Sequence, residues 1–223
     1  MVLALLLFIA PQILKAEQSG VFVGAQVGVA RVERDTTQID IRYDWVTYNA
    51  TSRTFTPLNN THFNSTRFGG LLGYKHFISD ELGFRAYFLF DGKFQAGSET
   101  NDFKTFNFNL NVDALYNFYT NKQRLSSIGL FVGGSAGGVQ HKQGLVIANG
   151  TDLALNAGLR TSVGNHSLEF YSRFAFLKAD KYLSIYEGTY VSNGKTYAQE
   201  TLHYEKIRQP YVFGIRYVYS FGF

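Results

Sequence analysis

The sequence predicts an all-β protein, an eight-stranded antiparallel transmembrane β-barrel with short periplasmic turns and longer extracellular loops. Three observations favour this fold. Large apolar residues alternate with small or polar ones in eight separate segments, aromatic residues make up 17% of the chain, and only 3 of its 223 residues are proline. Alternation with a period of two is typical of strands, because successive side chains of a strand point to opposite faces.

The C-terminal segment shows the pattern most clearly, with a large apolar residue at every second position from Tyr211 to Phe223. Small or polar residues, such as Gly214 and Arg216, lie between them. A tilted strand needs about 9–11 residues to cross a bilayer, and this segment is long enough. One aromatic face and one small or polar face suit a strand that meets lipid on one side only.

Seven earlier segments repeat the pattern. We expect strands over residues 21–29, 67–75, 82–91, 105–118, 128–138, 153–163 and 168–176. The links between strands are alternately short (78–81, 120–126, 164–166) and long (32–62, 95–104, 140–151, 179–206). This alternation is typical of outer-membrane barrels, in which an even number of strands leaves both termini in the periplasm.

A soluble barrel would show the same alternation with its apolar face turned inward. We favour the membrane orientation because each segment has about the length that a tilted membrane strand needs, and because large aromatic residues crowd one face. The other face then lines a narrow lumen filled by side chains, where charges of opposite sign have to pair. The expected lumen charges are Arg67, Arg85, Asp91, Asp113, Arg160, Glu169, Arg173 and Arg216, and Lys75 and Lys93 belong to the same face.

The N-terminal stretch is apolar but short. Its first ten residues are almost wholly apolar, whereas a helical span needs about 20. We interpret residues 1–16 as a signal peptide cleaved between Ala16 and Glu17, which leaves residues 17–223 as the barrel domain. The expected location is the outer membrane of a Gram-negative cell, reached through Sec export.

Composition argues against several kinds of chemistry. The net charge is +4, but Lys and Arg are scattered singly, so no nucleic-acid partner is expected. The absence of cysteine excludes disulfides and thiolate catalysis, and the five histidines include no close-spaced pair, so we expect no metal and no cofactor. His166 and Ser167 are neighbours in a predicted strand and would point to opposite faces, so no catalytic residue is assigned.

Three segments carry a resemblance to a known family. They are Asn111–Phe118 (NVDALYNF), Gly158–Arg160 followed by Asn165 and His166, and the C-terminal segment from Tyr211 to Phe221. Over residues 21–223 the chain resembles the barrel domain of the Helicobacter outer-membrane protein family, the Hop and Hor group. Larger members carry a host-binding domain after the first strand, where this chain has only residues 32–62. An aromatic C-terminus, here Tyr219, Phe221 and Phe223, is shared by most outer-membrane barrels and recognised by the barrel-insertion machinery.

The long loops carry the candidate contact residues, which are Tyr43, Trp45, Tyr48 and Phe55 in the first loop and Tyr186 and Tyr190 in the last. In the last loop Asn193–Gly194 is the expected hairpin turn, so its flanking strands are expected to extend well above the membrane. Tyr and Trp dominate binding hot spots, so these rings are candidates for contacting a host glycan or protein. The alternative is that they fold onto the barrel rim, because Trp and Tyr also favour the membrane interface.

Three functions remain open. The first is a surface-exposed structural or interaction protein held in outer-membrane lipid. A small anion-preferring pore ranks second: the inner face has an excess of Arg and Lys, but eight strands leave little room for water. A lipid A-modifying enzyme ranks third.

Overall fold

The computed structural model describes residues 17–44, 46–47, 49–93, 103–143, 146–177, 179–192 and 194–222. The described residues contain no helix that could span a membrane. In chain order the strands are β1 (Gly20–Asp44), β2 (Ala50–Phe77), β3 (Leu82–Lys93), β4 (Phe103–Asn121), β5 (Ser126–Gln143), β6 (Val146–Val163), β7 (His166–Ala175), β8 (Ala179–Ser192), β9 (Lys195–Arg208) and β10 (Tyr211–Gly222).

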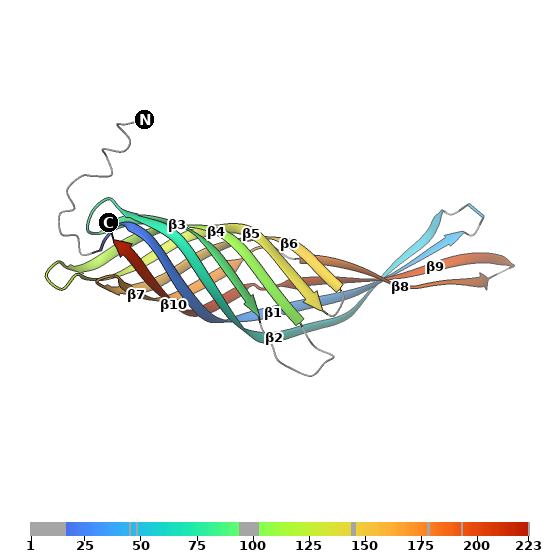
Figure 1. Cartoon of the computed structure of the whole chain (residues 1–223). Helices are drawn as coiled ribbons and strands as arrows, with labels where there is room; N and C mark the ends of the chain where they lie inside the picture. Colours follow the sequence, from blue (N-terminus) through green and yellow to red (C-terminus); the bar gives the residue numbers. More distant parts are fainter. Residues whose placement is uncertain are drawn as a thin grey trace, which may run out of the picture.

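Eight of these strands form a closed antiparallel barrel (Figure 1). The order around the ring is β1, β2, β3, β4, β5, β6, β7, β10, and the pairing of β10 with β1 closes it, from Gly20–Gly222 to Ala30–Val212. Closure leaves no free strand edge in the wall, which matters because lipid cannot hydrogen-bond to an exposed backbone. The predicted eight-stranded transmembrane barrel is confirmed.

The short connections 78–81, 122–125 and 164–165 lie at the same end of the barrel as the C-terminal strand end (Figure 1). Gly164 adopts a φ of +58°, a left-handed conformation that a tight turn requires and that glycine adopts without strain. Short turns mark the periplasmic end of outer-membrane barrels. The opposite end therefore faces the outside of the cell.

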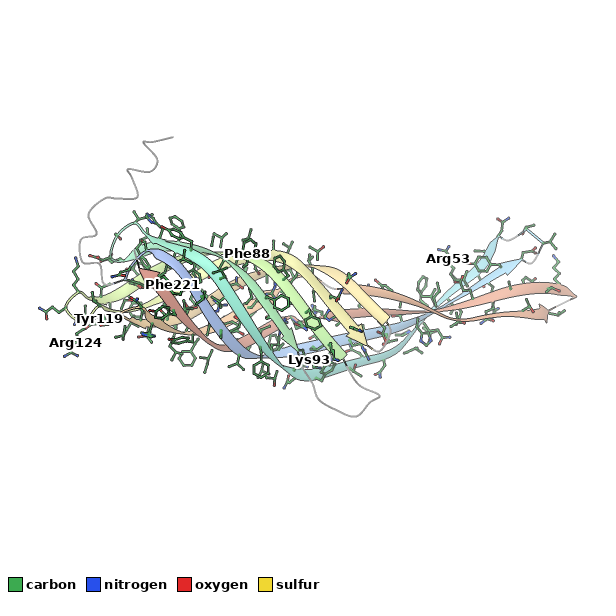
Figure 2. All side chains as sticks on the ribbon, in the orientation of Figure 1. Arg53, Phe88, Lys93, Tyr119, Arg124 and Phe221 are labelled. Carbon is green, nitrogen blue, oxygen red and sulfur yellow. The ribbon has the colours of Figure 1, made fainter. Side chains whose placement is uncertain are left out.

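The outer surface of the barrel is apolar. Leu72, Phe88 and Leu110 lie side by side on β2, β3 and β4, and each has about half of its side chain exposed. Phe88 also stacks on Phe108, with 5.8 Å between ring centroids. Side chains of this kind cover the outside of the wall around Phe88 (Figure 2). A continuous apolar surface of this size suits hydrocarbon rather than water.

The inner face of the barrel is polar. Its neighbouring strands β4 and β5 share the lumen unequally, with large side chains on β4 and none at the facing glycines of β5. Strand β4 turns an Asn/Asp row inward, while β5 offers glycines opposite it. A Cβ added at Gly133 would lie 2.2 Å from Asp113 Oδ1, and one at Gly137 would lie 2.3 Å from Asn109 Oδ1. The same Cβ atoms would lie 2.2 Å from the Val112 carbonyl oxygen and 2.0 Å from that of Phe108, so glycine is needed because β5 approaches the backbone of β4 too closely for a side chain.

Beyond the barrel the sheet continues as four strands, in the order β2, β1, β9, β8. Strand β1 pairs with β9 from Glu33–Arg208 to Asp44–Tyr197, and with β2 as far as Tyr43–Ala50. We call the part formed by residues 33–44, 50–63, 179–192 and 195–208 the extension; it projects from the outer end of the barrel (Figure 1). Twelve residues of β1 at about 3.3 Å each would carry it roughly 40 Å outward.

The extension corrects the expectation that residues 32–62 form a loop, but it agrees with the expectation that the strands beside the Asn193–Gly194 turn extend above the membrane, as β8 and β9 do. The connection expected over residues 140–151 is shorter than predicted, because β5 continues to Gln143 and β6 begins at Val146. Residues 32–62 and 179–206 connect barrel strands at the outer end, as predicted, but most of their length is strand. They lack a continuous apolar row because both faces of the extension meet solvent, so the alternation that reveals a lipid-facing strand is absent. The described part of the chain accordingly forms ten strands, eight of them in the barrel.

Candidate functional site

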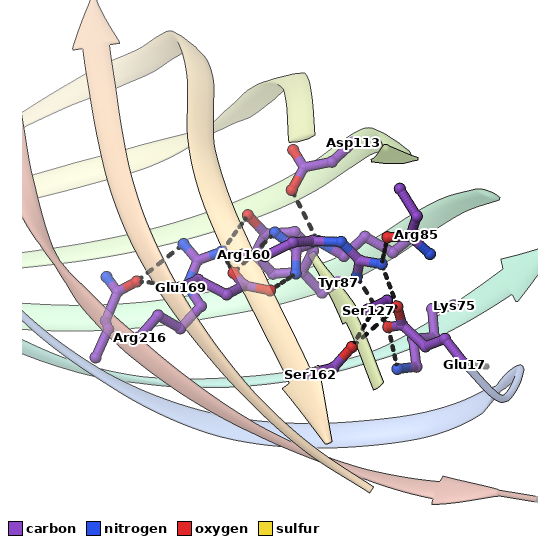
Figure 3. Close-up of polar contacts among 12 residues, drawn as sticks. Glu17, Lys75, Arg85, Tyr87, Asp113, Ser127, Arg160, Ser162, Glu169 and Arg216 are labelled. Carbon is purple, nitrogen blue, oxygen red and sulfur yellow. Dashed lines mark hydrogen bonds and ion pairs between the residues drawn. The ribbon is translucent and has the colours of Figure 1, made fainter. Parts of the chain in front are cut away.

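The middle of the lumen is crossed by an ion-pair network (Figure 3). Arg85 of β3 donates from Nη1 to Oε1 of Glu169 on β7 at 2.5 Å and from Nη2 to Oε2 at 3.1 Å. Arg85 Nε also donates to Asp113 Oδ2 at 2.9 Å, and Arg216 Nη1 of β10 donates to Glu169 Oε2 at 3.3 Å. Strands β3 and β7 lie four places apart in the ring of eight, so the network joins opposite walls.

Aromatic rings pack against the same guanidinium groups. The Arg85 guanidinium carbon lies 4.6 Å from the centroid of the Phe131 ring and 5.1 Å from that of Tyr87. The Arg216 guanidinium carbon lies 4.9 Å from the Tyr171 centroid. At these distances a cation is attracted to the ring face, and more strongly when it is shielded from water. Charged and aromatic groups together fill the middle of the lumen.

The outer end of the lumen contains further buried pairs. Arg173 donates to Asp152 Oδ2 at 2.5 Å, and Asn107 donates to the same oxygen at 3.3 Å. Arg67 pairs with Asp91 and also donates to Gln209 Oε1. The cavity beside Asp152 has a volume of about 20 Å³, which is room for about one water molecule.

The structure places all the charges assigned to the lumen from the sequence inside the barrel. None has more than 4% of its surface exposed: Arg67, Arg85, Asp91, Asp113, Arg160, Glu169, Arg173 and Arg216. Four further charged side chains are buried: Lys75 and Lys93, which the alternation also put on this face, and Glu17 and Asp152, which were not assigned. Lys75 lies in a predicted strand and on its polar face, so the alternation contained the signal. Glu17 precedes the first strand, and no periodic pattern could have placed it.

The aromatic residues assigned to the outer loops are placed only in part. Phe55 on β2 is 64% exposed, and the Tyr43 hydroxyl on β1 donates to Glu200 Oε2 at 3.1 Å. Partial burial and the nearby Glu200 carboxylate raise the pKa of Tyr43. Tyr186 and Tyr190 belong to strand β8, whereas Trp45 and Tyr48 lie outside the described residues.

The C-terminal aromatic residues lie at the periplasmic end of the wall. Tyr219 and Phe221 pack edge to face, with ring centroids 5.0 Å apart, and 45% of Phe221 is exposed on the outer surface. Phe223 lies outside the described residues.

The extension is an ordered sheet held by side-chain contacts between its strands. At its root Arg208 donates from Nε to Glu33 Oε2 at 2.8 Å, and farther out Thr201 Oγ1 donates to Asp40 Oδ1 at 2.7 Å. At the tip of the β1–β2 hairpin, Asp44 Oδ1 accepts the amides of Val46 and Thr47 at 2.9 and 3.0 Å. These two amide donors lower the pKa of Asp44.

One face of the extension carries a short apolar cluster that runs across three strands. Ile39 of β1 lies directly between Phe55 of β2 and Leu202 of β9, so the three side chains share a face. The next row on that face contains Arg53, Ile41 and Glu200. The face therefore combines apolar groups with both signs of charge, above the level at which the barrel closes.

The geometry also bears on a metal site and on a His–Ser catalytic pair. Among the described residues no group of three or more His, Cys, Asp or Glu side chains could hold a metal ion. His166 Nδ1 lies 2.6 Å from the Tyr217 hydroxyl on the outer surface, while Ser167 is buried on the inner face. The neighbouring His and Ser therefore cannot act on one another as base and nucleophile.

A closed, antiparallel wall with an apolar outside and a charged inside defines an integral β-barrel protein of the Gram-negative outer membrane. The chain belongs to the outer membrane protein beta-barrel domain family, whose pattern it matches over residues 1–221. No curated protein matches it.

Several solved outer-membrane proteins are similar to this chain. Neisserial surface protein A is 16% identical with a TM-score of 0.37, covering 82% of this chain and 99% of its own. Ail, the attachment invasion locus protein of Yersinia pestis, is 11% identical with a TM-score of 0.35, covering 81% and 99% respectively. OprG of Pseudomonas aeruginosa is 13% identical with a TM-score of 0.47, covering 95% of this chain and all of its own.

Proposed function

We propose that this protein is a surface interaction protein, in which the barrel anchors the extension outside the cell for contact with a host or envelope glycan or protein. The observation that carries the proposal is the continuation of β1 beyond the barrel, paired with β9 from Glu33 to Asp44. Sheet that extends past the membrane does not help to close the barrel. It does present two faces to the outside.

The order within the extension supports a binding role. A pre-formed surface loses less conformational entropy on binding than a flexible loop does. The Glu33–Arg208 and Asp40–Thr201 contacts, together with the backbone ladders, hold β1 and β9 in register. The exposed Phe55, next to Ile39, supplies the kind of aromatic group that anchors many interfaces.

The lumen supports the same assignment. The Arg85–Glu169 pair spans opposite walls, and aromatic rings pack against the same guanidinium group. A continuous water path would have to displace this network. We therefore assign the function of the protein to its extracellular surface rather than to its lumen.

The resemblance to the Helicobacter Hop and Hor group is part of this proposal. It rests on the Asn111–Phe118 segment, which forms part of β4 in the barrel wall. In that group a host-binding domain follows the first strand, and here β1 and β2 continue into the extension at the same place.

A binding experiment with cells that display the protein tests the proposal. In one variant residues 34–61 are replaced by a two-residue turn, and in a second the β8–β9 hairpin is also removed. Both are compared with the intact protein for adhesion to epithelial cells, for binding to a glycan array and to purified extracellular-matrix proteins, and for barrel folding by heat-modifiable electrophoretic mobility. We expect folding to be retained and binding to be lost. Equal binding by the intact and shortened proteins would refute the proposal.

A second candidate is a small anion-preferring pore, and the charge balance of the lumen favours it. Among the described residues the buried charged side chains comprise seven cations and five carboxylates; the cations are Arg67, Lys75, Arg85, Lys93, Arg160, Arg173 and Arg216, and the carboxylates are Glu17, Asp91, Asp113, Asp152 and Glu169. Planar-bilayer recordings distinguish the two functions. Stable ohmic steps that vanish on substitution of Arg85 or Arg160 would favour the pore, whereas a silent bilayer supports the interaction protein.

A further inference from the structure

The described residues that precede β1, Glu17 to Ser19, lead into the periplasmic end of the lumen (Figure 3). Glu17 has only 2% of its surface exposed. Burying a carboxylate is costly unless cations or hydrogen-bond donors compensate it, so the position of Glu17 requires such partners in the barrel wall.

Both oxygens of the Glu17 carboxylate are bonded. Oε1 accepts from Lys75 Nζ at 2.7 Å and from Arg160 Nη1 at 2.9 Å. Oε2 accepts from Arg160 Nη2 and from one of the Ser127 and Ser162 hydroxyls, which lie at 3.2 and 3.3 Å; the other hydroxyl donates within the 2.5 Å Ser127–Ser162 pair. A carboxylate with two cationic partners and a hydroxyl donor is compensated for its burial.

The partners of Glu17 come from opposite sides of the barrel. Lys75 belongs to β2 and Arg160 to β6, and these strands lie four places apart in the ring of eight. The single carboxylate therefore ties two facing walls together across the periplasmic mouth. Ser127 adds β5 to the same junction.

The two residues that follow fix the segment at the rim. Ser19 Oγ accepts the backbone amide of Phe77 on β2 at 2.9 Å. Gln18 lies against β10, since a Cβ added at Gly222 would come within 1.6 Å of Gln18 Oε1. The segment is thus held at three points, by β2, by β10 and by the Glu17 junction inside the lumen.

The Glu17 carboxylate neutralises two cations that lie behind the Glu17–Ser19 segment, Arg160 and Lys75. The Arg160 guanidinium carbon lies 5.2 Å and Lys75 Nζ lies 5.9 Å from the centroid of the same Phe77 ring, so the two cations are close neighbours in a buried space. Without Glu17, Arg160 keeps its 2.8 Å bond to Asn117, but two like charges are left facing one another. Repulsion and unmet solvation would then draw water into the mouth.

We infer that Glu17–Ser19 forms a strap that closes the periplasmic mouth of the lumen, with Glu17 as the latch between β2 and β6. The strap is independent of the extension and its partners. The predicted cleavage after Ala16 would leave the latch residue at the start of the mature chain, so that removal of the leader frees the residue that closes the mouth.

Cysteine accessibility tests the strap, and the chain is suited to the experiment because it contains no cysteine. A reporter Ser167→Cys places one thiol on the inner face directly opposite Ser162, at a site that is 4% exposed, without removing a contact of Glu17. The reporter protein is folded into lipid nanodiscs, and its reaction rate with a charged, membrane-impermeant methanethiosulfonate is measured alone and combined with Glu17→Gln. The matched control is Glu81→Gln, which makes the same change at an exposed turn of the same barrel end.

We expect Glu17→Gln to raise the reaction rate at least about tenfold and Glu81→Gln to leave it unchanged. If Glu17→Gln fails to fold, as judged by heat-modifiable mobility, Ser19→Ala provides the second variant. It removes only the rim anchor, and we expect a rise of at least about threefold. A reporter that reacts equally fast with the strap intact and with it altered would overturn the inference.

Discussion

Glu169 is the most informative single position in the lumen. It is fully buried and accepts hydrogen bonds from Arg85 at 2.5 and 3.1 Å and from Arg216 at 3.3 Å. Glu169→Gln keeps the shape of the side chain but removes the charge, and its amide nitrogen would face a guanidinium group. Breaking a buried ion pair by removing one partner costs about 3–5 kcal/mol.

We expect a loss of stability near the lower end of that range, because both arginines keep other partners. Arg85 retains Asp113 at 2.9 Å, and Arg216 retains Gln26 at 3.0 Å. We therefore expect Glu169→Gln to lower the free energy of unfolding by about 3 kcal/mol. Glu81→Gln, an exposed change of the same kind, is expected to shift it by less than about 0.5 kcal/mol.

The assay is reversible urea unfolding in phospholipid vesicles, followed by loss of the compact electrophoretic form. A double-mutant cycle with Arg85→Gln adds a second readout, because contacting residues in one network couple by about 0.5–3 kcal/mol. A Glu169→Gln protein as stable as the Glu81→Gln control, with no coupling to Arg85, would refute the idea that the network holds the two walls together.

Three further predictions concern the wall, the glycine row and the extension. Phe88→Arg, which puts a charge near mid-membrane, is expected to cost about 2–4 kcal/mol in vesicle unfolding, while Phe55→Ala in the extension leaves assembly unchanged; equal effects would be evidence against the assigned faces. Gly133→Val forces a side chain against the Val112 carbonyl oxygen and Asp113 Oδ1 and is expected to cost about 1–3 kcal/mol in the same assay, and an unaffected stability would contradict the packing described for β4 and β5. Hydrogen bonding from Arg208 lowers the pKa of Glu33 below its ordinary value of 4.5, so this contact stabilises the root of the extension fully above pH 4.5 and is lost as the pH falls through the lowered pKa. Amide protection at the root, that is, the intrinsic exchange rate divided by the observed rate, is therefore expected to fall in acid in the wild type and to lose that pH dependence in Arg208→Gln, and identical protection profiles would contradict it.

The barrel could be predicted from the sequence because its wall separates hydrocarbon from a polar interior. Each wall strand therefore alternates apolar residues that face lipid with polar residues that face the lumen. Phe106 and Asn107, for example, are adjacent in the chain and lie on opposite faces of β4. The same alternation placed Arg85 and Glu169 on the inner face. It could not show that they pair, because strand order and register around a closed ring decide which residues face one another.

The Asn193–Gly194 turn signal indicated the β8–β9 hairpin, but alternation could not predict the β1–β2 part of the extension or the strap. Thr36, Gln38 and Asp40 lie in a strand with solvent on both sides of the sheet, so no apolar row marks them. Glu17 lies outside every strand, and its place in the lumen depends on Lys75 and Arg160, which the fold brings together from distant parts of the chain.

The central claim is that the apolar rows of the wall face lipid. It is tested most directly by moving a single tryptophan between two adjacent residues of β3. With Trp45 replaced by Phe, Phe88→Trp and Leu89→Trp are each folded into vesicles of phospholipid brominated at mid-chain. Phe88 is 52% exposed on the outer face and Leu89 is 2% exposed on the inner face. The account predicts strong quenching by bromine at position 88 and little at position 89; equal quenching, or stronger quenching at position 89, would contradict it.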